Sequence, residues 1–256
     1  MSNVLLQSLE RDGYAVVRNI LHAERCNEIA RDINKESKKL PNLAHSNIVW
    51  DIRCLPEIKA IFRILWNDED LIVGFDGVGA RKKGADCDGL PWHVDQDGSH
   101  GDSVCCYQSI IAIKQSSLLT GNICVLPKSH KHHRSLAQRL DDGSGGWEFL
   151  EVPQDDIVFK LSLSPYCPDL QSGDMFIWDS RTVHMVSRPI DLNTERLVVY
   201  MCMTPRSFAN EETLRLREHA YLNGIATTHW PHRFVDRGEK WGNPQCPNNA
   251  KRMELV

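Results

Sequence analysis

The 256-residue sequence lacks the features that mark exported and membrane-spanning proteins. No apolar run approaches the roughly 20 residues that a membrane helix needs. The N-terminal stretch MSNVLLQSLERDG has no basic segment followed by an uninterrupted apolar one, so it does not resemble a signal peptide. The terminal MELV is not the peroxisomal address. We therefore expect a cytoplasmic protein with no membrane partner.

The sequence also has no excess of positive charge, internal repeat or low-complexity linker. The net charge is −4, which argues against nucleic acid as a partner. Apolar residues make up 41% and charged residues 25%, as in a globular protein with a sizeable core. The length fits one large domain.

The CxxC pattern is absent as well, since no two of the nine cysteines are three positions apart. A disulfide framework favours an even number of cysteines in a short secreted chain, and a structural zinc site favours close pairs. We interpret the cysteines as free thiols in a reducing compartment, with Cys105, Cys124 and Cys202 as small core residues.

The first 70 residues predict helices around one strand. Residues 14–21 (YAVVRNIL) are typical of a short strand, and residues 22–40 of an amphipathic helix with an apolar face. Residues 55–66 predict a second helix with Pro56 in its first turn. A further helix is expected within FANEETLRLREHAYLNG, near the C-terminus.

From about residue 71 the pattern changes to short β-rich runs separated by Gly, Asn and Asp turns. Many short strands of this kind favour an antiparallel sandwich or barrel. We expect a mainly β fold with flanking helices in a single domain, 1–256. It comprises a helical buttress (about 1–70), a β core (about 71–205) and a C-terminal helix and loop segment (about 206–256). The expected core strands lie at 71–78, 104–113, 121–127, 156–163, 174–179, 182–186 and 196–203.

The stretch PWHVDQD (91–97) holds the first candidate metal ligands. On an extended segment, residues i and i+2 share a face, so His93 and Asp95 would present an imidazole and a carboxylate together. His184, within a later β pattern, is the third candidate. Two histidines and one carboxylate are the facial set of non-haem Fe(II) oxygenases. The alternatives are an HxD that occurs by chance and a histidine that is hydrogen-bonded in the core.

Arg196 opens the strand that follows His184 and could bind a dicarboxylate through two parallel hydrogen bonds. The alternative for this arginine alone is a surface ion pair, for which Glu195 is the neighbouring candidate.

The sequence resembles the phytanoyl-CoA dioxygenase family of Fe(II)/2-oxoglutarate-dependent oxygenases from about residue 8 to 205. The resemblance rests on DGYAVVRNIL and then, in order, on WHVDQ, TGNICVLPKSHK, GDMFIWDSRTVH and RLVVY. It implies a double-stranded β-helix (jelly-roll) core with iron held by His93, Asp95 and His184. It also implies that Arg196 pairs with the far carboxylate of 2-oxoglutarate.

By the same resemblance, the cofactor is Fe(II), and 2-oxoglutarate and O2 are cosubstrates. Succinate and CO2 would be coproducts, and the iron ligands would act in catalysis through the metal. Related halogenases carry a small residue at the position of Asp95, so the resemblance implies hydroxylation of a C–H bond in a small organic molecule.

Further residues are secondary candidates. Gln108 and Tyr107 lie on the strand after HxD, where members of the family place groups near the cosubstrate, and Trp178 precedes the His184 strand. Each is as readily explained by packing. Asp179, Arg181 and Thr182 are candidates for the surroundings of the metal.

Four other features have no assigned chemistry. KSHKHHR (128–134) is interpreted as a solvated basic patch rather than a second metal site. Asp97 and His100 are expected at the rim of the barrel. THWPHRF (228–234) predicts either a lid over the pocket or an aromatic cluster that closes the core.

Two other functions compete with the small-molecule hydroxylase. One is an oxygenase that acts on a protein or other macromolecule. Demethylases of alkylated bases carry a second arginine six residues after the first, and here that position is Cys202. The other is a jelly-roll binding protein without catalysis. The oligomeric state is left open.

Overall fold

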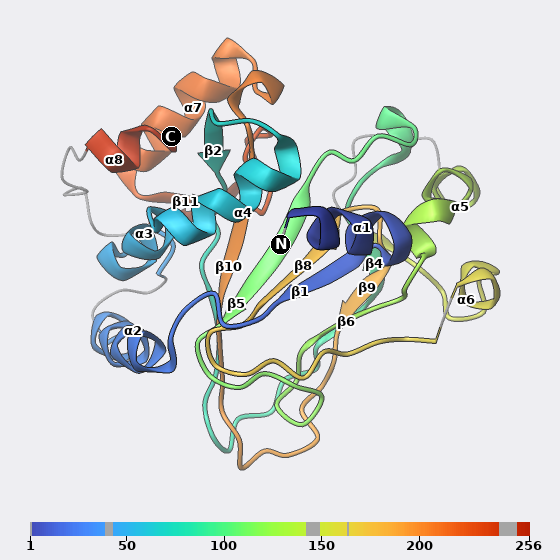
Figure 1. Ribbon diagram of the computed structural model, residues 1–256, viewed down its shortest axis with the longest axis horizontal. Helices are drawn as coiled ribbons and strands as arrows, with labels where there is room; N and C mark the ends of the chain where they lie inside the picture. Colours follow the sequence, from blue (N-terminus) through green and yellow to red (C-terminus); the bar gives the residue numbers. More distant parts are fainter. Residues whose placement is uncertain (1, 39–42, 142–148, 163, 241–249) are drawn as a thin grey trace.

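The computed structural model describes residues 2–38, 43–141, 149–162, 164–240 and 250–256. Its core consists of two antiparallel sheets, which confirms the expected β fold with flanking helices (Figure 1). The larger sheet has the strand order β1-β8-β5-β10-β2, with β3 also paired to β10, and the smaller sheet has the order β6-β9-β4-β7. The strands of these two sheets are β1 (Tyr14–Val17), β2 (Leu71–Val73), β3 (Val78–Arg81), β4 (Leu90–Val94), β5 (Tyr107–Ala112), β6 (Ile123–Val125), β7 (Leu150–Glu151), β8 (Met175–Asp179), β9 (His184–Val186) and β10 (Arg196–Pro205).

The two sheets face each other across an apolar layer, and this explains the continuous apolar runs in the sequence. In the larger sheet, residues at even positions such as Ile110, Phe176 and Val198 point inward and meet Ile123 and Val125 of the smaller sheet. Residues at odd positions of the same strands point outward into the helical layer. Strands buried on both faces are apolar at every position rather than at alternate ones.

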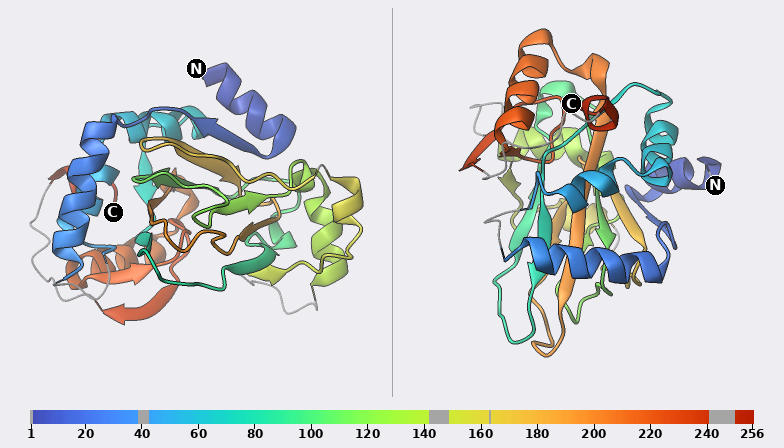
Figure 2. Two further views of the ribbon diagram at one scale, coloured as in Figure 1. Left: turned by 90° about the horizontal axis from the view of Figure 1, so that it is seen from below. Right: turned by 90° about the vertical axis from the view of Figure 1, so that its left-hand side faces the viewer.

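Helices cover the outer faces of both sheets (Figures 1 and 2). Those on the larger sheet include α2, whose buried residues Cys26, Ile29, Ala30 and Ile33 confirm the amphipathic pattern, and α4, which begins at Pro56 as predicted. The helices are α1 (Ser2–Asp12), α2 (Ala23–Glu36), α3 (Asn47–Arg53), α4 (Pro56–Trp66), α5 (His133–Leu140), α6 (Val158–Leu161), α7 (Glu211–Asn223) and α8 (Ala250–Met253). Between them lie the 3-10 turns η1 (Gly98–His100), η2 (Ser129–His132) and η3 (Arg206–Phe208), and the hairpin β11 (Ile225–Thr227) and β12 (Asp236–Lys240).

Two of the predicted strands differ in the structure. The strand expected at 156–163 is wrong, because Val158–Leu161 form α6, and the Asp156 carboxylate accepts a hydrogen bond from Val158 N at 2.8 Å. Residue 163 lies outside the described residues. The run at 71–78 is divided into β2 and the start of β3. No helix in the described part of the chain is long and apolar enough to cross a membrane.

His45 joins the helical layer to β11 and gives the fold a predictable pH dependence. Its Nε2 donates to Ile225 O at 2.8 Å, and its Nδ1 accepts from Trp50 Nε1 at 3.4 Å, which requires a neutral ring. Burial lowers the pKa of His45 from 6.5 to about 3. The unfolded chain therefore binds more protons than the folded one between these pH values, and stability falls as the pH drops below 6.5.

We expect His45 to account for a loss of about 2 kcal/mol in the free energy of unfolding between about pH 7.5 and about pH 5. Urea unfolding of the wild type and of His45→Gln at both pH values measures this loss as a difference of differences. His45→Gln should be less stable at the higher pH but less sensitive to acid. An unchanged pH dependence in the variant would contradict the assignment.

Candidate metal centre

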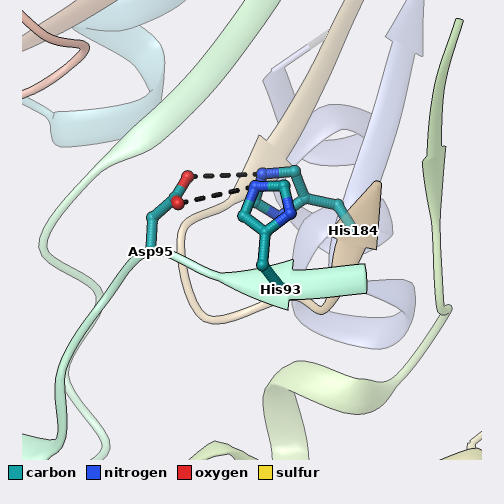
Figure 3. A group of neighbouring side chains, drawn as sticks. All are labelled: His93, Asp95 and His184. Carbon is teal, nitrogen blue, oxygen red and sulfur yellow. Dashed lines mark ion pairs between the residues drawn. The ribbon is translucent and has the colours of Figure 1, made fainter. Parts of the chain in front are cut away.

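Three buried side chains converge at one end of the smaller sheet (Figure 3). His93 on β4 lies directly opposite His184 on β9, and Asp95 follows immediately after the end of β4. Asp95 Oδ1 is 3.6 Å from His93 Nε2, and Asp95 Oδ2 is 3.3 Å from His184 Nε2. One ligand atom from each residue lies within 4.8 Å of the other two. The structure thus brings together the three residues that the sequence pattern indicated as candidate metal ligands.

Backbone carbonyls orient both imidazoles toward this point. His93 Nδ1 is 2.7 Å from Pro91 O, and His184 Nδ1 is 2.9 Å from Thr182 O, in each case two residues earlier. A carbonyl only accepts, so each Nδ1 carries a proton, and Nε2 is the ring atom that faces the site. Metal-binding histidines are held in place by this kind of bond.

The electrostatics keep the group ready to bind a cation. Burial lowers the pKa of His93 to about 4, with His184 contributing, so the ring is neutral near neutral pH. Burial would raise the pKa of Asp95, but His229 and His184 outweigh it and hold that pKa below its ordinary value. Two imidazoles and one carboxylate are a ligand set that fits a divalent transition metal.

Two of the secondary candidates contact this group. Gln108 Nε2 donates to Asp95 Oδ2 at 2.7 Å. Trp178, paired with Gln108 in the β5–β8 register, places its ring 5.4 Å from that of His184. Phe149 was not predicted and stacks on His93 with a centroid distance of 4.3 Å.

Gln108→Met is expected to weaken metal binding by roughly tenfold, because partners of ligands of this kind contribute about 10- to 100-fold to affinity. The amide orients the Asp95 carboxylate, and methionine keeps the length of the side chain without donating a hydrogen bond. Titration with Mn(II), which is stable in air, measures the effect. Affinity equal to that of the wild type would show that the amide does not orient the ligand.

A cavity of about 420 Å³ opens beside the three ligands, and its size suits a small molecule. His229 lines it, with Nε2 at 3.7 Å from Asp95 Oδ2; it belongs to the segment 228–234, for which the sequence predicts a lid over the pocket or a core cluster, without a role for this residue. Its segment 228–234 also buries Trp230 completely, so the segment contributes both to the pocket and to the core. The cavity is lined by Asp76, Leu90, His93, Asp95, Gln108, Ser109, Ile123, Phe149, Trp178, His184, Val186, Tyr200, Met201, Cys202, Thr228 and His229.

Arg196 does not line this cavity but an adjacent one of about 430 Å³, and Val186 is common to both. Arg196 is 8% exposed, and within the described residues its Nε and Nη2 have no hydrogen-bond partner. The alternative ion pair with Glu195 is not formed, since Glu195 pairs with Lys114. A buried guanidinium with free donors is suited to bind an anionic ligand.

Several predicted residues lie away from the centre. Tyr107 points to the opposite face of β5 and packs on Trp66, so we do not retain it as a cosubstrate contact. Asp97 is 3% exposed and caps η1 through Ser99 N, so it is not a rim residue. His100 lies at the end of η1 and contacts Arg233 at 3.0 Å.

The other candidates have structural roles. Asp179 and Arg181 form an ion pair at 2.6 Å, and Thr182 Oγ1 donates to Gly13 O. The solvated patch expected at 128–134 is wrong for two of its histidines. His130 and His133 are buried and bonded to Glu10 O and Gln96 O.

Comparisons with known proteins place this geometry in context. No protein-family model matches the chain. It is 25% identical over 271 residues to Ava biosynthesis cluster protein O of Aspergillus versicolor, which covers 88% of this chain and 85% of that protein. The epimerase SnoN, crystallised with Fe3+, alpha-ketoglutarate and nogalamycin RO, matches with a TM-score of 0.62 at 15% identity. The match covers 80% of this chain and 83% of the SnoN chain. HygX of Streptomyces hygroscopicus, with nickel and 2-oxoglutarate bound, matches with a TM-score of 0.57 at 14% identity. The match covers 80% of this chain and 87% of the HygX chain. At these identities the structural likeness establishes a shared fold.

Proposed function

We propose that the chain is an Fe(II)- and 2-oxoglutarate-dependent dioxygenase that oxidises a C–H bond of a small organic molecule. The observation that carries the proposal is the buried set of His93, Asp95 and His184, in which both Nε2 atoms lie within 3.6 Å of a carboxylate oxygen of Asp95. The fold likeness to SnoN and HygX, whose structures hold a metal and 2-oxoglutarate, supports this choice of cofactor and cosubstrate.

When bound, iron and 2-oxoglutarate would supply the oxidising chemistry, with succinate and CO2 as coproducts. His93, Asp95 and His184 would hold the metal on one side and leave its other positions open. Gln108 keeps the carboxylate oriented, and all three ligands are buried. The free donors of Arg196 would bind the distal carboxylate of 2-oxoglutarate.

We propose hydroxylation as the reaction because Asp95 fills the third ligand position. SnoN is a non-heme alpha-ketoglutarate-dependent epimerase, so inversion of configuration is the second outcome to be tested. Product analysis must therefore follow both oxygen incorporation and inversion of configuration.

The decisive experiment adds Fe(II) and then 2-oxoglutarate under anaerobic conditions and follows the visible charge-transfer absorption of the complex. O2 is then admitted, and succinate is measured with and without a panel of small molecules. Metal-dependent binding of 2-oxoglutarate and formation of succinate are expected. If 2-oxoglutarate does not bind in the presence of the metal, the proposal is wrong.

A further inference from the structure

Two cysteine thiols lie against each other beside the metal cavity. Cys106 Sγ and Cys202 Sγ are 2.8 Å apart, and both residues are buried and free of disulfides. Cys106 precedes β5, and Cys202 is on the neighbouring strand β10, so they are 96 residues apart in sequence. Only a small movement is needed to reach the S–S bond length of roughly 2 Å.

The two thiols differ in their access to the cavity. Cys202 is among the lining residues, and its register partner on β5 is Gln108, whose amide binds Asp95. Cys106 is not among them and lies behind Cys202, with Sγ 3.7 Å from the carbonyl of His229. Cys202 is therefore accessible from the cavity that the metal ligands line, and Cys106 is reached from that cavity through its contact with Cys202.

Burial keeps the inner thiol protonated. It raises the pKa of Cys106 well above its ordinary value, and contact with Cys202 adds to the effect. A protonated thiol is a poor nucleophile and a poor metal ligand. It is, however, a good donor of a hydrogen atom, because an S–H bond is weaker than an aliphatic C–H bond.

We propose that Cys202 and Cys106 form a built-in reductant, which supplies the two electrons that reduce the second oxygen atom to water when 2-oxoglutarate and O2 are consumed with no substrate bound. This inference rests on the proposed function. The reaction is 2-oxoglutarate plus O2 plus two thiols to succinate, CO2, water and one disulfide. One oxygen atom enters succinate. The other accepts two protons and two electrons from the thiols, that is two hydrogen atoms in all, and becomes water, while the two S–H bonds break and one S–S bond forms.

Without such a reductant, the oxidising equivalent would attack the side chains that line the cavity. Trp178, Phe149 and Tyr200 are the oxidisable aromatic residues there. Cys202 offers a weaker bond in the same cavity, and Cys106 completes the second electron transfer. A small thiol of the glutathione class would then reduce the disulfide by attacking Cys202 from the cavity side.

A second thiol pair in the same chain provides an internal control. The thiols of Cys124 and Cys167 are near enough to shift each other's pKa, and neither residue lines the metal cavity. Cys124 points outward into the cluster between the smaller sheet, α5 and α6. Oxidation that starts at the metal should spare this pair, whereas diffusing peroxide should oxidise both.

The first test incubates the protein with Fe(II), 2-oxoglutarate and O2, without substrate, ascorbate or added thiol. Alkylation and tandem mass spectrometry then locate disulfides. About one Cys106–Cys202 disulfide per succinate is expected, with the Cys124–Cys167 thiols intact. Cys202→Ser and Cys106→Ser should form no such disulfide and should gain oxygen on the peptide that contains Trp178. Cys105→Ser and Cys124→Ser serve as matched controls and should behave as the wild type.

The second test does not require turnover. Metal-free protein is equilibrated with oxidised glutathione, and the Cys106–Cys202 disulfide should form in preference to all others. If it does not form, or if both pairs oxidise equally during turnover, the inference is wrong. Succinate without the disulfide, or no succinate from protein that binds 2-oxoglutarate in the presence of the metal, would overturn the inference alone. Failure to bind 2-oxoglutarate would overturn the proposed function and the inference with it.

Discussion

Asp95→Asn is expected to abolish measurable Fe(II) binding and 2-oxoglutarate turnover, while Asp97→Asn retains both. Asp95 is the single anionic member of the ligand set, and the pKa of its carboxyl is held below the ordinary value, so it is ionised at neutral pH. Asparagine keeps the shape but offers a neutral oxygen to a divalent cation. Because partners of ligands alone contribute about 10- to 100-fold, loss of a ligand should cost at least about a hundredfold in affinity.

Asp97→Asn is a close control because it makes the same chemical change two residues away in a residue that is equally buried. Asparagine can still accept the hydrogen bond from Ser99 N, so the cap of η1 survives, and only the contact with Arg233 at 3.6 Å is lost. Calorimetric titration with Mn(II) and with Fe(II) under nitrogen measures both variants, and circular dichroism verifies the fold. Equal metal affinity in Asp95→Asn and the wild type would refute the assignment of the ligands.

The spacing of residues along the chain was sufficient to predict the two candidate metal ligands that lie at the end of one strand. His93 and Asp95 share a face because they are two residues apart near the end of a strand, and this follows from the chain alone. His184 required an assumption about the order of strands, which the antiparallel pairing of β4 with β9 supports. The alternation of even and odd positions in β5, β8 and β10 explains why Gln108 faces the site and its neighbour Tyr107 does not.

Features that depend on distant partners could not be predicted in this way. His133 is buried because its Nε2 bonds to Gln96 O, and His130 because it bonds to Glu10 O, 120 residues away. The local sequence shows only a basic cluster. His229 reaches the cavity through the packing of the segment after β11, which has no periodic pattern to indicate a direction.

Arg196→Met is expected to lower the affinity for 2-oxoglutarate by on the order of a hundredfold while metal binding is unchanged. Removal of one partner from a buried, hydrogen-bonded charge pair costs 2–5 kcal/mol, and about 3 kcal/mol corresponds to roughly a hundredfold in Kd. Methionine is close in length and apolar, so it fills the site without offering a donor. Anaerobic titration of the iron-loaded protein with 2-oxoglutarate measures the change.

Arg81→Met is the control for Arg196→Met, because it also removes a buried cation but should leave the affinity for 2-oxoglutarate unchanged. Arg81 lies opposite Arg196 in the β3–β10 register and lines the same adjacent cavity. Its guanidinium is already bonded to Thr194 Oγ1 at 2.8 Å and to Ala85 O at 3.0 Å, whereas two nitrogens of Arg196 have no partner within the described residues.

The two variants should therefore differ in stability as well as in binding. Without 2-oxoglutarate, Arg196→Met should unfold at the same or a higher temperature than the wild type, because a buried charge with unsatisfied donors has been removed. Arg81→Met should lose at least about 2 kcal/mol, because it breaks charged hydrogen bonds that join three loops. Thermal unfolding with and without 2-oxoglutarate measures both effects. If Arg81→Met alone lost affinity for the cosubstrate, the binding role would belong to Arg81, and the free donors of Arg196 would need another ligand.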